Sequence, residues 1–396
     1  MTMQIAAKFQ RPWRTAATLM IASIAKRGGL KNNGTSNSAS SGIMKPNRHH
    51  DFEIMMLKRS GQSKSFANQY VFPGGVIDAA DFSEEWIPIF EKSGLDMLDS
   101  NSHRLKTIVN ENRIELYTDF DEAVLSEIAY RICAIRETFE ESGILFAKSL
   151  KTQPQSQDLT NSAPKNRFVR VYKPESPNLL EQWRNKVHDN GAEFINMCKQ
   201  LEVIPDIFGL IEWSNWLTPI TVKRRFDTVF YLCFTDTELD AVQDQKEMTM
   251  LEWYDPEQAL RNFKKGQVNL APPQVYELSR LWQFPSMESM LEFSVKRSSN
   301  GCQRIYPVPI QLDNAYMHVF PGDELYPKYP NFNQPEKPVE VVSGTLEERN
   351  KMDKRKHRYT FASKSKWPAH GQLFVNVDFP DGQIAGKDLN DPTSKL

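Results

Sequence analysis

Apolar residues recur along the chain with two different periods, and together these predict a mixed α/β protein. Short runs rich in β-branched and aromatic residues predict strands at residues 54–58, 70–72, 207–217, 228–234 and 248–253. Longer segments with a spacing of three and four residues predict helices at residues 121–142, 179–201, 256–263 and 273–283. Strands mixed with helices are typical of an α/β or α+β sandwich, in which helices cover a mixed sheet.

The N-terminal region supports two interpretations. The apolar run WRTAATLMIASIA at residues 13–25 predicts a first buried strand. However, residues 1–50 carry eight Lys or Arg and no acidic residue, which is typical of a mitochondrial presequence. We favour the strand and keep a mitochondrial address as the alternative.

The predicted helix at 121–142 separates apolar from acidic residues. At about 100° per residue, one stripe is apolar and consists of Ile128, Ile132, Ile135 and Phe139. The opposite side carries Glu137, Glu140 and Glu141. We expect Asp119 or Asp121 to cap the start of this helix, and Gly143 to end it.

Three glutamates on one helical face need an explanation, because like charges one turn apart cost about 0.2–0.5 kcal/mol per pair. A bound divalent cation would reverse this penalty. From Glu137, Glu140 and Glu141 alone, a solvated acidic face remains the alternative. Upstream, YVFPGGVIDAAD places Gly74 and Gly75 after a strand-like run, where their backbone amides could approach a phosphate or form a simple tight turn.

These two stretches resemble the sequence motif of the Nudix hydrolases. That motif contains a glycine, then a glutamate, and then the run R-E-U-x-E-E-x-G-U, in which U is bulky and apolar. Residues 136–144, RETFEESGI, match the final run except that Thr138 replaces an apolar residue. Gly75 matches the first glycine, Asp81 stands where the glutamate is expected, and residues 82–135 separate the two halves.

The split motif is most similar to the peroxisomal coenzyme A diphosphatase branch of this family. The likeness extends over WRTAA, RRFDTVFYL at 224–232, LAPPQVYEL at 270–278 and PGDELYP at 321–327. A coenzyme A motif is loosely kept in Leu57, Arg59, Ser60 and the sequence FPGG.

This resemblance implies a Nudix α/β/α sandwich with a mixed sheet and large loop insertions. We expect a hydrolase domain at 13–285, with insertions at about 28–50, 82–120 and 151–166. Residues 286–396 would form a C-terminal extension that packs on this domain and ends in a flexible tail. A region rich in Pro and Lys at about 329–357 predicts a further polar insertion.

The resemblance also implies roles for site residues. Glu137, Glu140 and Glu141 would hold Mg²⁺ or Mn²⁺, hard cations that prefer oxygen ligands. Arg136 would orient a glutamate within the motif. Glu247, in the sequence DQKEMTMLEW, is the best remote candidate for the general base, and a surface glutamate before a strand is the alternative.

Positive residues near the predicted strand ends are candidates for binding substrate phosphates. They are Lys58, Arg59 and residues 223–225, of which we choose Arg59 and Arg225, together with Gly74 and Gly75. For each cation a solvated charge at a strand end is the alternative. His49 and His50 lie in a polar insertion, where a metal-binding role is not expected.

The composition of the chain argues against several classes of binding partner. A net charge of −1 over 396 residues argues against a polybasic nucleic-acid binder, and the absence of a long apolar run argues against a membrane span. Four well-separated cysteines favour reduced thiols over zinc or disulfides. The C-terminal Ser394, Lys395 and Leu396 form a peroxisomal address that an import receptor reads.

The resulting hypothesis is metal-dependent hydrolysis of the diphosphate of coenzyme A or acyl-coenzyme A. The resemblance implies 3',5'-ADP and 4'-phosphopantetheine, or its acylated form, as products. Hydrolysis of ADP-ribose, NADH, a nucleotide sugar or capped RNA is the second interpretation. A Nudix scaffold that binds without catalysis is the third.

Overall fold

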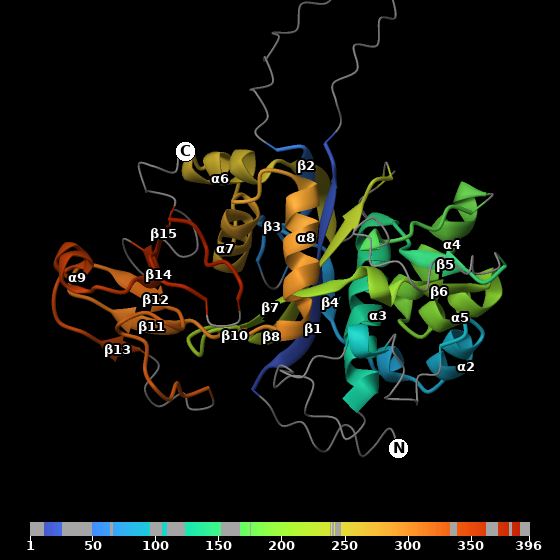
Figure 1. Ribbon diagram of the computed structural model, residues 1–396, viewed down its shortest axis with the longest axis horizontal. Coiled ribbons are helices and arrows are strands. Elements are labelled where there is room, and N and C mark those ends of the chain that lie inside the picture. Colours follow the sequence, from blue (N-terminus) through green and yellow to red (C-terminus); the bar gives the residue numbers. More distant parts are fainter. Residues whose placement is uncertain are drawn as a thin grey trace, which may run out of the picture.

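The computed structural model describes residues 12–25, 50–63, 66–95, 105–108, 123–151, 167–174, 176–237, 239, 241, 247–332, 339–361, 371–379 and 382–388. Its centre is an eight-stranded mixed sheet (Figure 1). The main path through this sheet follows the order β10 (Arg304–Ile305), β7 (Ile211–Leu217), β8 (Phe226–Thr235), β1 (Arg14–Ile24), β2 (Phe52–Arg59) and β3 (Tyr70–Val71). β4 (Gly74–Val76) pairs with β1, and β9 (Met248–Tyr254) pairs with β2.

The strand β1 lies at the centre of this sheet and explains its mixed character. It runs parallel to β8 and antiparallel to β2 and β4. Leu19 and Ile21 face one apolar core, whereas Met20 and Ala22 face the other. Because successive side chains of a strand point to opposite faces, a strand buried on both faces reads as a continuous apolar run. The predicted strand at 13–25 is therefore confirmed.

Helices cover both faces of the sheet and complete a sandwich (Figure 1). One layer holds α2 (Trp86–Glu91), α3 (Ala123–Ser142), α4 (Pro177–Asp189) and α5 (Glu193–Leu201), together with the small sheet of β5 (Ala147–Ser149) and β6 (Val203–Pro205). The other layer holds α6 (Pro256–Lys264), α7 (Pro272–Leu281) and α8 (Met287–Arg297). Short 3₁₀ turns are η1 (Ala79–Phe82), η2 (Leu105–Thr107), η5 (Ile207–Gly209) and η6 (Ser298–Asn300).

The expected α/β fold class is thus confirmed, but two expected elements differ. Residues 179–201 form two helices, because the chain turns at Asn190 and Gly191 between α4 and α5. Residues 207–217 begin with a 3₁₀ turn before β7. Asp119 and Asp121, the expected caps of α3, lie outside the described residues, whereas Gly143 ends α3 with a φ of 74° as expected.

The C-terminal region forms a second sheet. Its five strands follow the order β13 (Glu340–Val341), β11 (Val308–Gln311), β12 (Tyr316–Val319), β14 (His357–Phe361) and β15 (Gln372–Val375). The strand β13 and the helix α9 (Leu346–Met352) lie within the polar insertion expected at about 329–357, so this insertion contains regular structure.

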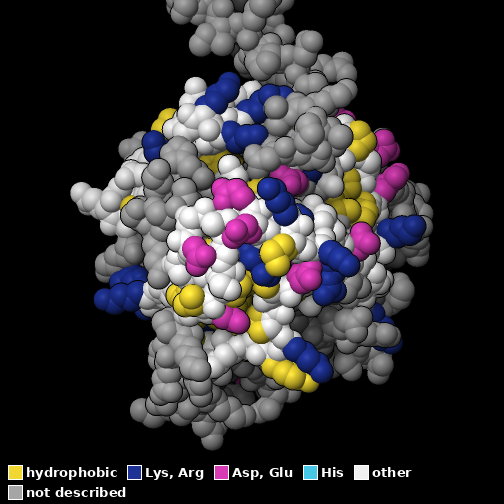
Figure 2. Space-filling model, turned by 90° about the vertical axis from the view of Figure 1, so that its left-hand side faces the viewer, with side chains coloured by type: hydrophobic (Ala, Val, Ile, Leu, Met, Phe, Trp, Pro, Cys, Tyr) yellow, Lys and Arg dark blue, Asp and Glu magenta, His cyan; other side chains and the backbone are white. Residues whose placement is uncertain are grey.

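This second sheet packs against the first sandwich. Its residues Tyr316, Phe320 and Tyr359 share one apolar core with Trp213 and Trp216 of β7. Figure 2 shows the end of the molecule at which the second sheet lies, with basic and acidic side chains interspersed over its described part. This mixture of charges does not favour binding of an anion on that face.

Candidate active site

Arg136 joins the two halves of the split motif. Its Nε and Nη2 atoms donate to the two carboxylate oxygens of Asp81, each at 2.9 Å. Its Nη1 atom donates to Glu137 at 2.9 Å and to Glu140 at 2.7 Å. The Asp81 carboxylate also accepts the backbone N–H of Asp78 at 2.8 Å, which fixes the turn η1. The residues on either side of the gap at 82–135 are therefore held together by one buried arginine.

Gly75 leaves room for a carboxylate, and Gly74 leaves room for the backbone of β1. A Cβ atom added to Gly75 would lie 2.3 Å from Oε2 of Glu137. Gly74 has a φ of 150°, and its N–H donates to Oε2 of Glu141 at 2.9 Å. In this structure the Gly74 amide, which we expected to approach a phosphate, donates to Glu141 instead, and the phosphate contact stays a prediction.

Glu137 and Glu141 line a cavity of about 680 Å³, whereas Glu140 does not. Glu140 is directed to Arg136 and lies 3.7 Å from Nδ1 of His188 on α4. Three acidic residues share a helical face, but only two of them face the cavity. The position of Glu140 beside Arg136 therefore points to a positioning role, whereas its role as a direct metal ligand stays a prediction.

The three glutamates of α3 have raised pKa values. Burial raises the pKa of Glu137 to about 7 against the opposing charge of Arg136. Burial, and then the charge of Glu137, raise the pKa of Glu141 well above its usual range. Burial also raises the pKa of Glu140, again against Arg136. Crowded, desolvated carboxylates of this kind become stable as anions when a cation lies between them.

The carboxylates facing the cavity fit a hard divalent cation. Mg²⁺ is commonly bound through one or two protein carboxylates together with substrate phosphates. Glu137 and Glu141 supply two such groups, and Glu247 lines the same cavity. Within the described residues, no three His, Cys, Asp or Glu side chains come together as a complete metal site. Substrate oxygens and water would have to complete the coordination.

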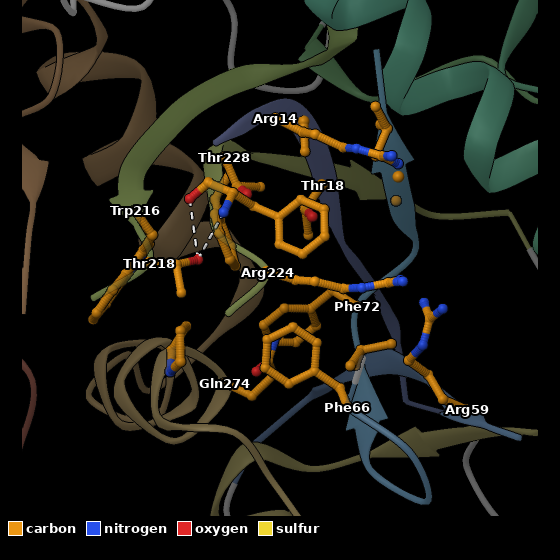
Figure 3. Close-up of a pocket in the computed structure, with 18 of the residues that line it drawn as sticks. Arg14, Thr18, Arg59, Phe66, Phe72, Trp216, Thr218, Arg224, Thr228 and Gln274 are labelled. Carbon is orange, nitrogen blue, oxygen red and sulfur yellow. Dashed lines mark hydrogen bonds between the residues drawn. The ribbon is translucent and has the colours of Figure 1, made fainter. Parts of the chain in front are cut away.

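Three arginines from different segments line the cavity beside these carboxylates. They are Arg14 at the start of β1, Arg59 at the end of β2, and Arg224 just before β8. Figure 3 shows their guanidinium groups on the side of the cavity opposite Trp216. Arg59 lies 3.7 Å from Glu247, so the remote base candidate does belong to this cavity.

Arg225, which we predicted to hold a phosphate, does not line the cavity. It is buried, and it donates from Nε to the carbonyl of Thr218 at 3.0 Å and from Nη1 to that of Phe332 at 2.8 Å. Its guanidinium lies 4.9 Å from the centre of the Trp13 ring. The neighbouring Arg224 faces the cavity instead.

The opposite side of the cavity is largely apolar. Its residues include Trp216, beside which Figure 3 shows the polar Thr218. Phe66, Phe72, Gln274 of α7 and His318 of β12 also line the cavity. Sequence analysis assigned no role to Arg14, Trp216, Gln274 or His318. Gln274 stands within LAPPQVYEL, which carried part of the family resemblance, whereas no local pattern marks His318.

His50 lies outside the cavity and has a structural role. Its Nδ1 atom is 2.9 Å from Oδ2 of Asp255, and its Nε2 atom is 3.0 Å from the carbonyl oxygen of Trp282. His49 lies outside the described residues. None of the helices in the described part of the chain combines the length and apolar character needed to cross a bilayer.

Sequence comparisons identify relatives over most of the chain. A family model for the NUDT19 Nudix domain matches residues 13–281, and a model for the NUDT19 C-terminal domain matches residues 310–370. The acyl-coenzyme A diphosphatase NUDT19 of Xenopus laevis is 35% identical, and the match covers 87% of this chain and 89% of that protein. The protein of the same name from Gallus gallus is 33% identical, and the match covers 93% of this chain and 97% of that protein. The one from Homo sapiens is 31% identical, and the match covers 79% of this chain and 80% of that protein.

Comparison of structures adds a distant match. A crystal structure of a Nudix hydrolase from Alicyclobacillus acidocaldarius is 17% identical and covers 72% of this chain and 97% of that chain. The TM-score of this match is 0.47.

Proposed function

The chain belongs to the NUDT19 family of Nudix hydrolases, and from this premise we propose that it hydrolyses the diphosphate of coenzyme A and acyl-coenzyme A. The products are 3',5'-ADP and 4'-phosphopantetheine, or its acylated form. The observation that carries the proposal is the meeting of Glu137 and Glu141 with three arginines in one cavity. Relatives named acyl-coenzyme A diphosphatase support the choice of substrate.

The charges of the cavity match those of the substrate. Coenzyme A carries a diphosphate and a 3'-phosphate. Arg14, Arg59 and Arg224 bind these anions, since a guanidinium presents several donors that fit phosphate oxygens. The apolar side near Trp216 accommodates the uncharged arm of the substrate.

The acidic residues supply the remaining chemistry. Glu137 and Glu141 would hold Mg²⁺ or Mn²⁺, which would neutralise charge on the phosphoryl oxygens and activate a water molecule for attack. Arg136 fixes the direction of Glu137 through the contact at 2.9 Å. Glu247 accepts the proton of the attacking water; its position in the cavity beside Arg59 supports this role.

A substrate panel tests the proposal. Purified protein is incubated with Mg²⁺ and, separately, with coenzyme A, an acyl-coenzyme A, ADP-ribose and NADH, and the products are separated by chromatography. We expect coenzyme A and its thioester to give 3',5'-ADP, with no product in EDTA and recovery when Mg²⁺ or Mn²⁺ is added in excess. Absence of any turnover would contradict hydrolysis, whereas much faster cleavage of ADP-ribose would overturn only the choice of substrate.

We also propose that the protein enters peroxisomes through its C-terminal tripeptide. Ser394, Lys395 and Leu396 lie outside the described residues, and the proposal rests on the sequence S-K-L at the C-terminus. A fluorescent protein fused to the N-terminus should colocalise with a peroxisomal marker, and deletion of the tripeptide should disperse it. Retention in peroxisomes after the deletion would refute this address. A second fusion carries the tag near residue 390, so that both ends of the chain stay free, and a mitochondrial location of this protein would also refute the address.

A further inference from the structure

Two buried polar residues that the proposed chemistry does not use line the cavity. They are Gln274 of α7 and His318 of β12, whose residues are 7% and 2% exposed. Oε1 of Gln274 and Nε2 of His318 have no hydrogen-bond partner among the described residues. Buried polar atoms in folded proteins almost always have partners, so two unsatisfied atoms at one cavity indicate a place for a ligand.

We propose that Gln274 and His318 form a subsite for an uncharged amide in the pantetheine arm of the substrate. This inference rests on the function proposed above and assigns its recognition to specific residues. The C-terminal sheet thereby contributes to the substrate site, because His318 belongs to β12 of that sheet.

The chemistry of the two side chains favours an amide over a charged group. Burial lowers the pKa of His318 to about 3, so its imidazole is neutral at physiological pH and has one donor and one acceptor nitrogen. Gln274 is also neutral, and its Oε1 accepts hydrogen bonds. A secondary amide offers the complementary N–H and C=O. A phosphate or carboxylate would instead favour the arginine side of the cavity.

The surrounding wall suits the carbon chain on either side of an amide. Trp216 lines the cavity, and its Nε1 donates to the buried carboxylate of Glu277 at 2.7 Å. Its ring also meets Tyr276 and Phe320 edge-on, with centroid distances of 5.3 and 5.7 Å. The Trp216 ring is therefore held from several directions and presents a fixed apolar surface. Pantetheine, in which amides alternate with short aliphatic segments, has matching chemistry.

Inhibition by the two half-products tests this subsite separately. In Gln274→Met and His318→Leu, we expect the inhibition constant of 4'-phosphopantetheine to rise by about five- to tenfold, as for the loss of one hydrogen bond. The inhibition constant of 3',5'-ADP should stay within about twofold of wild type. Gln258→Met is the matched control, since Gln258 lies on α6, donates to Asn262 and does not line the cavity.

The possible outcomes distinguish the subsite from the proposed function. If the wild type cleaves coenzyme A but both variants bind 4'-phosphopantetheine as tightly as Gln258→Met, the subsite is refuted and the function stands. If the wild type does not cleave coenzyme A, the function fails and the subsite fails with it. Unchanged inhibition by 3',5'-ADP shows that a variant is folded, and should His318→Leu not fold, Gln274→Met decides alone.

Discussion

Replacement of Asp81 by alanine should strongly destabilise the protein, because it removes the main partner of a buried arginine. Two of the four short hydrogen bonds from Arg136 to carboxylates go to Asp81, and the two side chains are 5% and 1% exposed. Removing one member of a buried pair costs about 3–5 kcal/mol, whereas an exposed pair contributes about 0–1 kcal/mol. Because both side chains are buried, we expect Asp81→Ala to lower the free energy of unfolding by about 3–5 kcal/mol.

Equilibrium unfolding in urea, followed by circular dichroism, measures this loss. Asp236→Ala is the matched control, because Asp236 is exposed and its replacement should change the free energy of unfolding by no more than about 0.5 kcal/mol. Adding Arg136→Met to Asp81→Ala should cost less than the sum of the two single changes, since both changes remove the same ion pair. A loss for Asp81→Ala as small as that for Asp236→Ala would refute the claim that this pair joins the split motif.

Three further predictions follow from individual contacts. Gly75→Ala should lower kcat at least about tenfold in the diphosphatase assay, because the new Cβ atom would lie 2.3 Å from Glu137; unchanged kcat would contradict this. Burial lowers the pKa of His50, but the hydrogen bond and charge of Asp255 outweigh burial and raise this pKa above 6.5. The protonated ring therefore stabilises the folded protein fully below about pH 6.5, and this stabilisation is lost as the pH rises through the folded-state pKa. In urea unfolding, His50→Gln should therefore lower the free energy of unfolding more at pH 6 than at pH 9. Equal decreases at the two pH values would refute this role of His50. Arg224→Ala should raise KM for coenzyme A about tenfold without lowering the melting temperature, and an unchanged KM would remove this residue from phosphate binding.

The elements with a strong local pattern could be predicted from sequence. The strand β1 is buried on both faces, so its apolar run is continuous and easily identified. The apolar stripe of α3 also predicted its buried face correctly, because Ile128, Ile132 and Phe139 are all buried in one core. The family motif then predicted that α3 and the glycines of β4 would meet, as they do in the structure.

The roles that depend on tertiary packing could not be predicted in the same way. Helical periodicity places Glu137, Glu140 and Glu141 on one face, but it does not reveal that Arg136 holds Glu140 away from the cavity. Arg224 and Arg225 are adjacent and identical in type, so only their tertiary contacts distinguish them. Arg225 lies over the Trp13 ring and donates to the carbonyl oxygens of Thr218 and Phe332.

The second sheet contributes a residue that no local signal marked. His318 reaches the cavity only because β12 pairs within the C-terminal sheet and that sheet shares a core with β7. Such a contact joins segments about a hundred residues apart, and the period of apolar residues carries no information on it.

The most direct test of the account compares Glu141→Gln with Glu140→Gln in the hydrolysis of coenzyme A at saturating Mg²⁺. Glu141 faces the cavity, so its loss should lower kcat at least about a hundredfold. Glu140 faces Arg136, and glutamine keeps an oxygen acceptor there, so this variant should lose less than about tenfold. A Glu141→Gln enzyme with nearly full activity, or a Glu140→Gln enzyme that is the more impaired, would contradict the assignment of Glu137 and Glu141 as the reactive side of this site.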